Sequence, residues 1–282
     1  MLVREALAWG ALELEGFTSK QLESRILLSS ILKITQEDLL IRYNEAISQE
    51  EESSFSEYIK RRKLLEPIAY IVGKKEFYGR DFIVNKHVLI PRPETELIID
   101  MVVLEYQKNF TDKEVTILDL GTGSGAIAVT LAALIPQAKI IATDISDEAL
   151  MLAAENAKLH GTIAQIQFIK SDWYSNLPGK EFDFIVSNQP YISPDNKIYM
   201  AQETILYEPE HALFAVENGL INYRKIIFGL NNFLKNENKV FLEIGFNQAE
   251  DVINILKKYP FTEIVISKDL SGHDRVIEFR FI

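Results

Sequence analysis

LDLGTGSGA (Leu118–Ala126) is the stretch that decides the fold of this 282-residue chain. It joins an apolar run, Val115–Leu120, which we predict to be a strand, to a predicted helix over 124–134. Its three glycines, at 121, 123 and 125, permit a tight turn and let backbone amides approach a ligand closely. A strand, a glycine-rich turn and a helix in this order are typical of nucleotide-binding α/β folds.

Working outward, short apolar runs alternate with helical patterns over most of the chain. Runs such as VTILDL and FDFIVS are apolar almost throughout, which is typical of a sheet covered on both faces. We therefore predict an α/β domain with a doubly wound, seven-stranded parallel sheet whose last strands run antiparallel at one edge. The predicted strands are 115–120, 139–143, 166–169, 182–187, 239–245, 262–267 and 275–281, and the predicted helices are 124–134, 146–159, 219–235 and 247–258.

The N-terminal part has a different pattern. Helix-start signals at Thr18–Gln21 and Ser48–Glu51, with apolar residues at helical spacing, predict three or four helices over residues 1–66, ended by Pro67. Around Gly79 the pattern becomes that of a β-hairpin, so we predict a linker over 67–90 and the α/β domain over 91–282. This organisation is a small helical-bundle domain followed by a Rossmann-like domain.

Composition and charge exclude several classes of function. The chain has no cysteine, so it forms no disulfide, thiolate metal site or cysteine nucleophile, and its scattered histidines predict no metal site. The 30 basic residues against 41 acidic ones give a net charge of −11, which disfavours direct binding to nucleic acid. The sequence lacks the apolar segments of a signal peptide or a membrane span, so we expect a cytoplasmic protein without membrane contact. We also expect a monomer.

Asp144 ends the second predicted strand, 23 residues after Gly121. A carboxylate there can accept hydrogen bonds from two ribose hydroxyls, which predicts a cofactor that contains adenosine. Because Gly121, Gly123 and Ala126 also fit the pattern G-x-G-x-x-A, the loop alone does not separate NAD from S-adenosylmethionine.

NQPY, Asn188 to Tyr191, follows the fourth predicted strand at the carboxyl edge of the sheet. The Asn188 side-chain oxygen and a neighbouring backbone carbonyl would accept both hydrogens of a planar NH2 group and turn its lone pair toward a methyl donor. The Tyr191 ring would pack on the flat amide or base. A plain Asn-Pro turn is the alternative.

Several motifs together resemble the bacterial release factor glutamine methyltransferase family. They extend over nearly the whole chain, and their combination is far more specific than each alone: PRPETE (91–96), LDLGTGSGAIA (118–128), SDW (171–173), FDFIVSNQPYI (182–192), YEPEHALFA (207–215), NGL (218–220), EIG (243–245) and DLSGHDRV (269–276). The resemblance implies transfer of a methyl group from S-adenosylmethionine to the glutamine side chain of the Gly-Gly-Gln motif in peptide chain release factors.

The resemblance also implies site residues. It assigns the cofactor to Gly121, Thr122, Gly123, Ser124, Gly125, Asp144 and Trp173. It gives Asn188 contact with both cofactor and substrate, groups Gln189, Pro190 and Tyr191 around the substrate, and makes Asn188 and Tyr191 the catalytic pair. The helical domain would dock the release factor. One residue departs from the family, which has proline where this chain has Gln189; glutamine keeps the carbonyl but loses the fixed φ, and its side chain could reach the substrate pocket.

Three functions stay open on the sequence: the glutamine methyltransferase, an adenine-N6 methyltransferase acting on nucleic acid, and a weakly active protein that only binds release factors. The four histidines, at 87, 160, 211 and 273, are expected on the surface or in structural roles. Of Glu94 and Glu96, at most one is expected to line the pocket. The segment 201–217 is either a lid or a surface loop.

Overall fold

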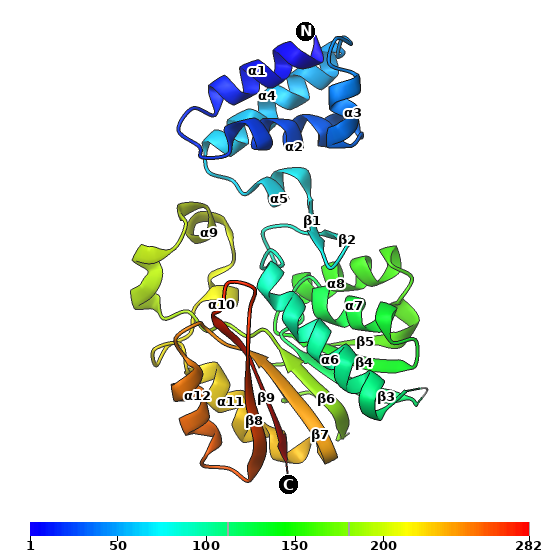
Figure 1. The fold of residues 1–282 in the computed structure, drawn as a ribbon, viewed down its shortest axis with the longest axis vertical. Helices are drawn as coiled ribbons and strands as arrows, with labels where there is room; N and C mark the ends of the chain where they lie inside the picture. Colours follow the sequence, from blue (N-terminus) through cyan, green and yellow to red (C-terminus); the bar gives the residue numbers. More distant parts are fainter. Residues whose placement is uncertain (112, 180, 282) are drawn as a thin grey trace. The chain divides into compact units, whose positions relative to one another are not determined.

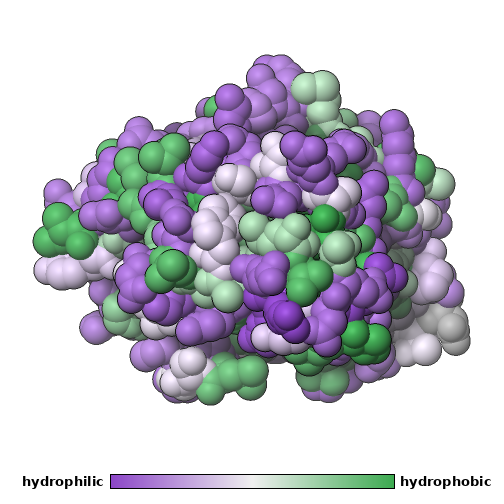
Figure 2. All heavy atoms as spheres, turned by 90° about the horizontal axis from the view of Figure 1, so that it is seen from above, coloured by the Kyte–Doolittle hydropathy of each residue, from purple (hydrophilic) through white to green (hydrophobic). Residues whose placement is uncertain are grey.

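The computed structural model describes residues 1–111, 113–179 and 181–281. Contacts divide the chain into two compact units, Met1–Lys74 with Ala201–Tyr207, and Lys75–Met200 with Glu208–Ile282. Hydrophilic side chains cover most of the face in Figure 2, with hydrophobic ones among them in separate groups, as is usual for a surface exposed to water. Among the described residues, no helix combines the length and apolar character that crossing a bilayer requires.

The first unit is a helical bundle around its own apolar core, as predicted. Its helices are α1 (Val3–Glu13), α2 (Lys20–Leu32), α3 (Gln36–Ile41), α4 (Gln49–Lys63), α5 (Ile68–Val72) and, from the later segment, α9 (Gln202–Tyr207). The Ser48–Glu51 capping box is confirmed, since each of these residues bonds the backbone of the other. The start predicted at Thr18 is wrong, because Ser19 is the N-cap residue and its side chain makes no capping bond.

The predicted linker over 67–90 needs a correction. Pro67 follows the end of α4 and serves as the N-cap of the fifth helix, which occupies Ile68–Val72 within the first unit. The hairpin itself is present around Gly79, with strands β1 (Lys74–Phe77) and β2 (Arg80–Ile83). All five residues of IAYIV are apolar, and so short an apolar run fits a buried helix turn as well as a strand.

Basic side chains at the end of α4 are held in ion pairs within the first unit. Arg62 is buried and contacts Glu23 at 2.8 Å and Glu203 of α9 at 2.5 Å, and its guanidinium lies over the Phe17 ring. Lys63 pairs with Glu13 at 2.8 Å. The later segment 201–207 is therefore fixed to the bundle by charge as well as by packing.

The second unit has a seven-stranded sheet in the order β5-β4-β3-β6-β7-β9-β8 (Figure 1). The pairs from β5 to β7 are parallel, and β9 runs antiparallel to both its neighbours, which confirms the predicted sheet. Its strands are β3 (Val115–Leu120), β4 (Ala138–Asp144), β5 (Ile166–Lys170), β6 (Phe182–Ser187), β7 (Leu234–Glu243), β8 (Phe261–Lys268) and β9 (Asp274–Phe281).

Helices cover both faces of this sheet, because alternate strand residues point to opposite sides. Side chains such as Ile117 and Phe184 pack with α6 (Glu96–Asn109), α7 (Ala126–Leu134) and α8 (Asp147–Leu159). Neighbours such as Leu118 and Ile185 pack with α11 (Ile221–Gly229) and α12 (Ala249–Leu256) on the other face. Figure 1 shows these two layers on either side of the strands.

The helix predicted over 219–235 ends earlier, at Gly229, and β7 begins at Leu234. Short helical turns complete the unit at η1 (Pro93–Thr95), η2 (Ile163–Gln165), η3 (Pro194–Tyr199), α10 (Glu210–Leu213) and η4 (Leu230–Asn232). Because β3 connects onward to β4 while β6 lies on its other side, the strand order reverses between β3 and β6. Ligands of open α/β sheets bind outside the carboxyl ends of the strands at such a point.

Candidate functional site

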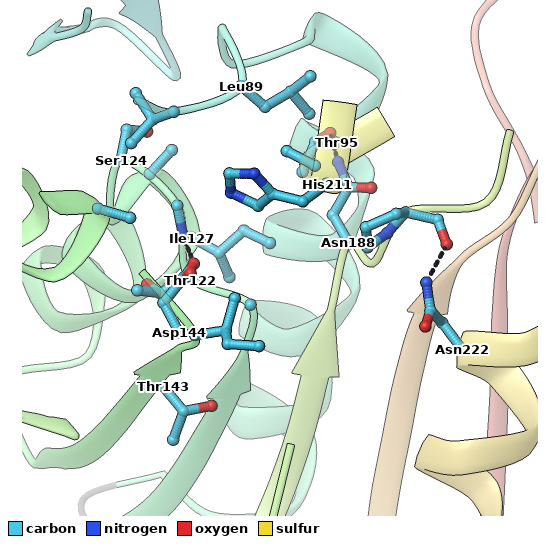
Figure 3. A pocket seen from close by; sticks show the side chains of 18 of the residues that line it. Leu89, Thr95, Thr122, Ser124, Ile127, Thr143, Asp144, Asn188, His211 and Asn222 are labelled. Atoms are coloured by element: carbon cyan, nitrogen blue, oxygen red, sulfur yellow. Dashed lines mark hydrogen bonds between the residues drawn. The ribbon is translucent and has the colours of Figure 1, made fainter. Parts of the chain in front are cut away.

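A cavity of about 370 Å³ opens at this point of the second unit. Its volume is in the range of sites that hold a cofactor or a small molecule. The loops after β3, β4 and β6 supply its floor, and residues 87–95 and 211–225 supply further walls. We call the part around Gly121–Gly125 and Asp144 the glycine-loop end, and the part around Thr95, Asn188 and His211 the Asn188 end (Figure 3).

At the glycine-loop end, the backbone is folded by its own hydrogen bonds. The amides of Gly121 and Thr122 both donate to the Thr143 carbonyl, at 2.9 and 2.8 Å, and the Gly125 amide donates to the Thr122 carbonyl at 2.8 Å. The Gly123 amide donates to Asp144 Oδ2 at 2.9 Å. These amides are committed within the chain, so the loop is poorly suited to a pyrophosphate, which needs several free N–H groups.

Asp144 and Trp173 line the same end of the cavity. The Asp144 carboxylate also accepts the Ser146 amide at 3.0 Å, which fixes its direction at the end of β4. Trp173 has a left-handed backbone with φ of 51°, and its ring lies 4.0 Å from where a Cβ at Gly121 would stand. A side chain at 121 would therefore fill the space beside the indole.

This end fits an adenosine cofactor without phosphates. It offers a carboxylate for ribose hydroxyls, an indole for a flat base and a loop in which the amides of Gly121, Thr122, Gly123 and Gly125 already bond within the chain. The predicted residues Gly121, Thr122, Gly123, Ser124, Asp144 and Trp173 all line the cavity, whereas Gly125 does not. Gly125 is the N-cap residue of α7, at φ of 81°, and a Cβ there would lie 3.0 Å from that of Ala153.

Asp119 lies under the glycine loop and is fully buried. Its carboxylate accepts a hydrogen bond from the Thr122 hydroxyl at 2.7 Å. Burial raises the pKa of Asp119 to about 7, although the Thr122 bond acts in the opposite direction. The loop is thus supported by a carboxyl group that resists ionisation.

At the Asn188 end, a chain of hydrogen bonds holds the Asn188 carboxamide. Asn188 Nδ2 donates to the Thr95 hydroxyl at 2.9 Å, and that hydroxyl donates to Glu243 Oε2 at 2.6 Å. The backbone behind it is held as well, since Asn222 donates to the Pro190 carbonyl at 2.8 Å. Asn188, Pro190, Thr95 and Asn222 line the cavity.

Gln189 and Tyr191 are not among the cavity-lining residues. The Gln189 side chain is buried and donates to the Glu243 carbonyl at 2.7 Å, so it points away from the cavity. The Tyr191 hydroxyl donates to Glu243 Oε1 at 2.9 Å, and its ring packs against the core on the α11 side. Tyr191 therefore holds the backbone of NQPY against the core. Its packing on the substrate stays a prediction.

The motifs NGL and EIG support the same backbone. Gly219, at φ of 85°, lies so close that a Cβ there would be 2.0 Å from the Tyr191 carbonyl oxygen. Gln248 donates to that carbonyl at 2.9 Å and accepts the Gly245 amide at 3.0 Å. These motifs therefore set the path of residues 188–191.

Sequence reasoning missed two residues of this end. Thr95 does not stand out in the sequence beside Glu94 and Glu96, neither of which lines the cavity, and His211 is expected on the surface or in a structural role. Figure 3 shows the His211 imidazole directed into the cavity beside Asn188. The position of Thr95 in the middle of PETE, at a helix start, was the available signal.

The segment that carries His211 is attached on both sides. Glu208 is buried and accepts the Ile90 amide at 3.1 Å and the Arg92 guanidinium at 2.5 Å. Farther along, the Ile192 amide donates to the Leu213 carbonyl at 3.1 Å. Part of the segment 201–217 is therefore joined to the backbone directly after NQPY. No group of side chains suited to a metal ion is found among the described residues.

Comparisons with known proteins agree with this geometry. The family model described as the methyltransferase small domain matches residues 99–252, and that described as the PrmC N-terminal domain matches residues 5–73. A methyltransferase structure from Pyrococcus furiosus is similar over 82% of this chain and 100% of that one, with a TM-score of 0.53 at 20% identity. At that identity the likeness shows the fold alone.

Relatives in sequence are closer. A bifunctional methyltransferase of Rickettsia prowazekii is 46% identical over 93% of this chain, which spans 54% of that protein, about half its length. Release factor glutamine methyltransferases of Bacillus cereus and Staphylococcus aureus are 37% and 38% identical; the matches cover 98% and 95% of this chain and 98% and 94% of those proteins. The chain belongs to the release factor glutamine methyltransferase family.

Proposed function

We propose that this chain transfers the methyl group of S-adenosylmethionine to the side-chain amide nitrogen of the glutamine in the Gly-Gly-Gln motif of peptide chain release factors. The observation that carries the proposal is the direction of the Asn188 carboxamide. Its nitrogen is taken by Thr95 within a cavity that also holds Asp144 and Trp173, so its oxygen is left to accept from a substrate NH2 group.

The glycine-loop end would bind and orient the cofactor. S-adenosylmethionine, when bound, supplies an electrophilic methyl group attached to a sulfonium. Asp144 would accept the ribose hydroxyls and Trp173 would lie against the adenine, both from the wall of the glycine-loop end. The inward-bonded amides of Gly121, Thr122, Gly123 and Gly125 keep the loop in one shape, so little ordering is needed on binding.

The acceptor end has to orient a poor nucleophile, since the lone pair of an amide nitrogen is delocalised into its carbonyl. Asn188 Oδ1 and the Gln189 carbonyl would hold the two N–H groups and direct the lone pair toward the methyl group. Positioning of this kind supplies up to ~7–11 kcal/mol of the barrier. The same two oxygens would stabilise positive charge that develops on the nitrogen in the transition state. The proton then leaves to water.

The helical unit would dock the release factor, which is the partner that the names of the family's members indicate. We place the protein in the cytoplasm, where translation takes place, and propose that it acts as a monomer without binding nucleic acid. The balance of 30 basic and 41 acidic residues supports a protein substrate over a nucleic acid.

The test is incubation of the full chain with S-adenosylmethionine labelled on its methyl group. A release factor, the same factor with the motif glutamine changed to glutamate, and single- and double-stranded DNA serve as parallel substrates. Label in the unchanged release factor alone is expected. Label in DNA would favour an adenine-N6 methyltransferase, and binding of release factor without any label would identify a binding protein; either result overturns the proposal.

A further inference from the structure

Behind the Asn188 end lies a buried carboxylate that does not line the cavity. Glu243 ends β7, is 1% exposed and does not line the cavity. Its Oε2 accepts the Thr95 hydroxyl at 2.6 Å, and its Oε1 accepts the Tyr191 hydroxyl at 2.9 Å. Both motifs that flank the site, PETE and NQPY, thus meet at one carboxylate.

The direction of these bonds decides what Thr95 presents to Asn188. A hydroxyl has one hydrogen, and that of Thr95 is used on Glu243. Only oxygen lone pairs remain for Asn188, and these accept an N–H but repel a carbonyl oxygen. The carboxamide nitrogen must therefore face Thr95, at the observed 2.9 Å, and Oδ1 must face away from it.

We propose that Glu243 is a positioning residue that acts through Thr95 to select the acceptor orientation of the Asn188 carboxamide. The inference rests on the proposed function, because that orientation matters only to a substrate that presents N–H groups. With the carboxamide turned over, its NH2 group would meet the NH2 group of the substrate, and two acceptors would meet at Thr95. Neither contact forms a hydrogen bond.

A buried carboxylate is a costly way to hold two hydroxyls. Burial raises the pKa of Glu243, and the bonds from Thr95 and Tyr191, with Arg275 nearby, act against that rise. An apolar pair of similar size would commonly be no less stable than buried charge. What only an acceptor on Glu243 provides is the direction of the Thr95 hydroxyl, and through it the direction of Asn188.

Three substitutions separate the hydrogen bond of the Thr95 hydroxyl from the packing of the Thr95 side chain. Thr95→Val keeps the shape and removes the hydroxyl, whereas Thr95→Ser keeps the hydroxyl and removes a methyl group. Thr130→Val makes the same exchange at a buried threonine of α7, away from the cavity. Turnover, KM for release factor and Kd for S-adenosylmethionine are measured for each variant beside the parent protein.

We expect Thr95→Val to lose at least tenfold in kcat, with KM and Kd within about threefold, since the interaction strengthens as charge develops. Thr95→Ser and Thr130→Val should keep kcat within about threefold. Parental turnover in Thr95→Val, or an equal loss in Thr95→Ser, would overturn the proposal, as would a rise in KM that accounts for the whole effect.

A readout without substrate separates this inference from the proposed function. Nitrogen-15 NMR of the Asn188 side-chain amide should show slow hydrogen exchange in the parent and in Thr95→Ser, and fast exchange in Thr95→Val. If Thr95→Val does not fold, Glu243→Met takes its place: a side chain of similar length without an oxygen leaves the Thr95 hydroxyl without its acceptor, so kcat should fall. Parental kcat in Glu243→Met would refute the role.

Discussion

At the glycine-loop end of the cavity, hydrogen bonds join groups that lie within residues 119–144, whereas at the Asn188 end they join side chains from distant segments. The amides of Gly121, Thr122 and Gly123 bond within 118–144. Asn188 depends on Thr95, 93 residues earlier, and Thr95 on Glu243, 148 residues later. A local motif therefore preorganises the glycine-loop end, while the Asn188 end is assembled only when the sheet is complete.

The largest effect is expected at the Asn188 end, where a side chain from a distant segment holds Asn188. Asn188→Ala removes the acceptor from the nitrogen that must attack, and one lost group of this kind costs ~10²–10³ in rate. The loss should appear in single-turnover methylation, with release-factor affinity little changed. Methylation by Asn188→Ala at the parental rate would show that the Asn188 end does not orient the substrate.

The buried carboxyl under the glycine loop offers the next test. Because the pKa of Asp119 is about 7 in the folded protein and 3.8 is its ordinary value, Asp119 stabilises the fold at low pH and loses this contribution as the pH rises through 7. Asp119→Asn lacks that loss and still accepts from Thr122. We expect the difference in unfolding free energy between variant and parent to grow by about 3 kcal/mol from pH 5 to pH 8.

Urea unfolding at several pH values measures this difference. The sign is the essential point: the asparagine variant must gain on the parent as the pH rises. If the free energy of unfolding changes with pH in the same way in both proteins, Asp119 ionises in the folded protein as easily as in the unfolded one, and burial does not raise its pKa.

The cofactor end is tested by its ribose carboxylate. Asp144→Ala would remove the two charge-assisted hydrogen bonds that we propose to the ribose, each worth roughly 1.5–3 kcal/mol, so S-adenosylmethionine should bind at least tenfold more weakly by calorimetry. Asp147→Ala is the matched control, because Asp147 lies at the start of α8, outside the cavity, in an exposed pair with Lys170. NAD should show no saturable binding to the parent. Equal affinities of the two variants would contradict the assignment.

The sequence predicted the glycine-loop end of the cavity better than the Asn188 end, because the contacts of the first are local in the sequence and those of the second are not. Strand, turn and helix signals lie within a few residues of one another, so β3, the glycine loop and Asp144 could be placed from local patterns. The side-chain direction of Gln189 depends on where β7 lies, and no local pattern carries that information. The same holds for Tyr191, which reaches Glu243 across 52 residues.

A smaller effect is expected at His211, which lines the Asn188 end without a hydrogen bond to Asn188 among those of the described residues. His211→Gln removes an imidazole from the wall, but the attacking nitrogen keeps its acceptors and its proton can leave to water. We expect less than a tenfold change, mainly in KM for release factor. His273→Gln, outside the cavity, is the control, and a loss in kcat as large as that of Asn188→Ala would give the imidazole a chemical role.

Gln189→Pro should have the smallest effect, and it asks how far the Asn188 end depends on one backbone position. The substitution loses the bond from Nε2 to the Glu243 carbonyl, worth about 1 kcal/mol, but the Tyr223 hydroxyl lies 3.2 Å from the same oxygen. It also removes Oε1, which is buried without a hydrogen bond among the described residues. Proline fixes φ and keeps the carbonyl, so turnover should hold steady or rise within about threefold.

Gln189→Ala removes the side chain without fixing φ and is measured beside Gln189→Pro. If both variants are markedly slower than the parent, the buried glutamine itself holds the site.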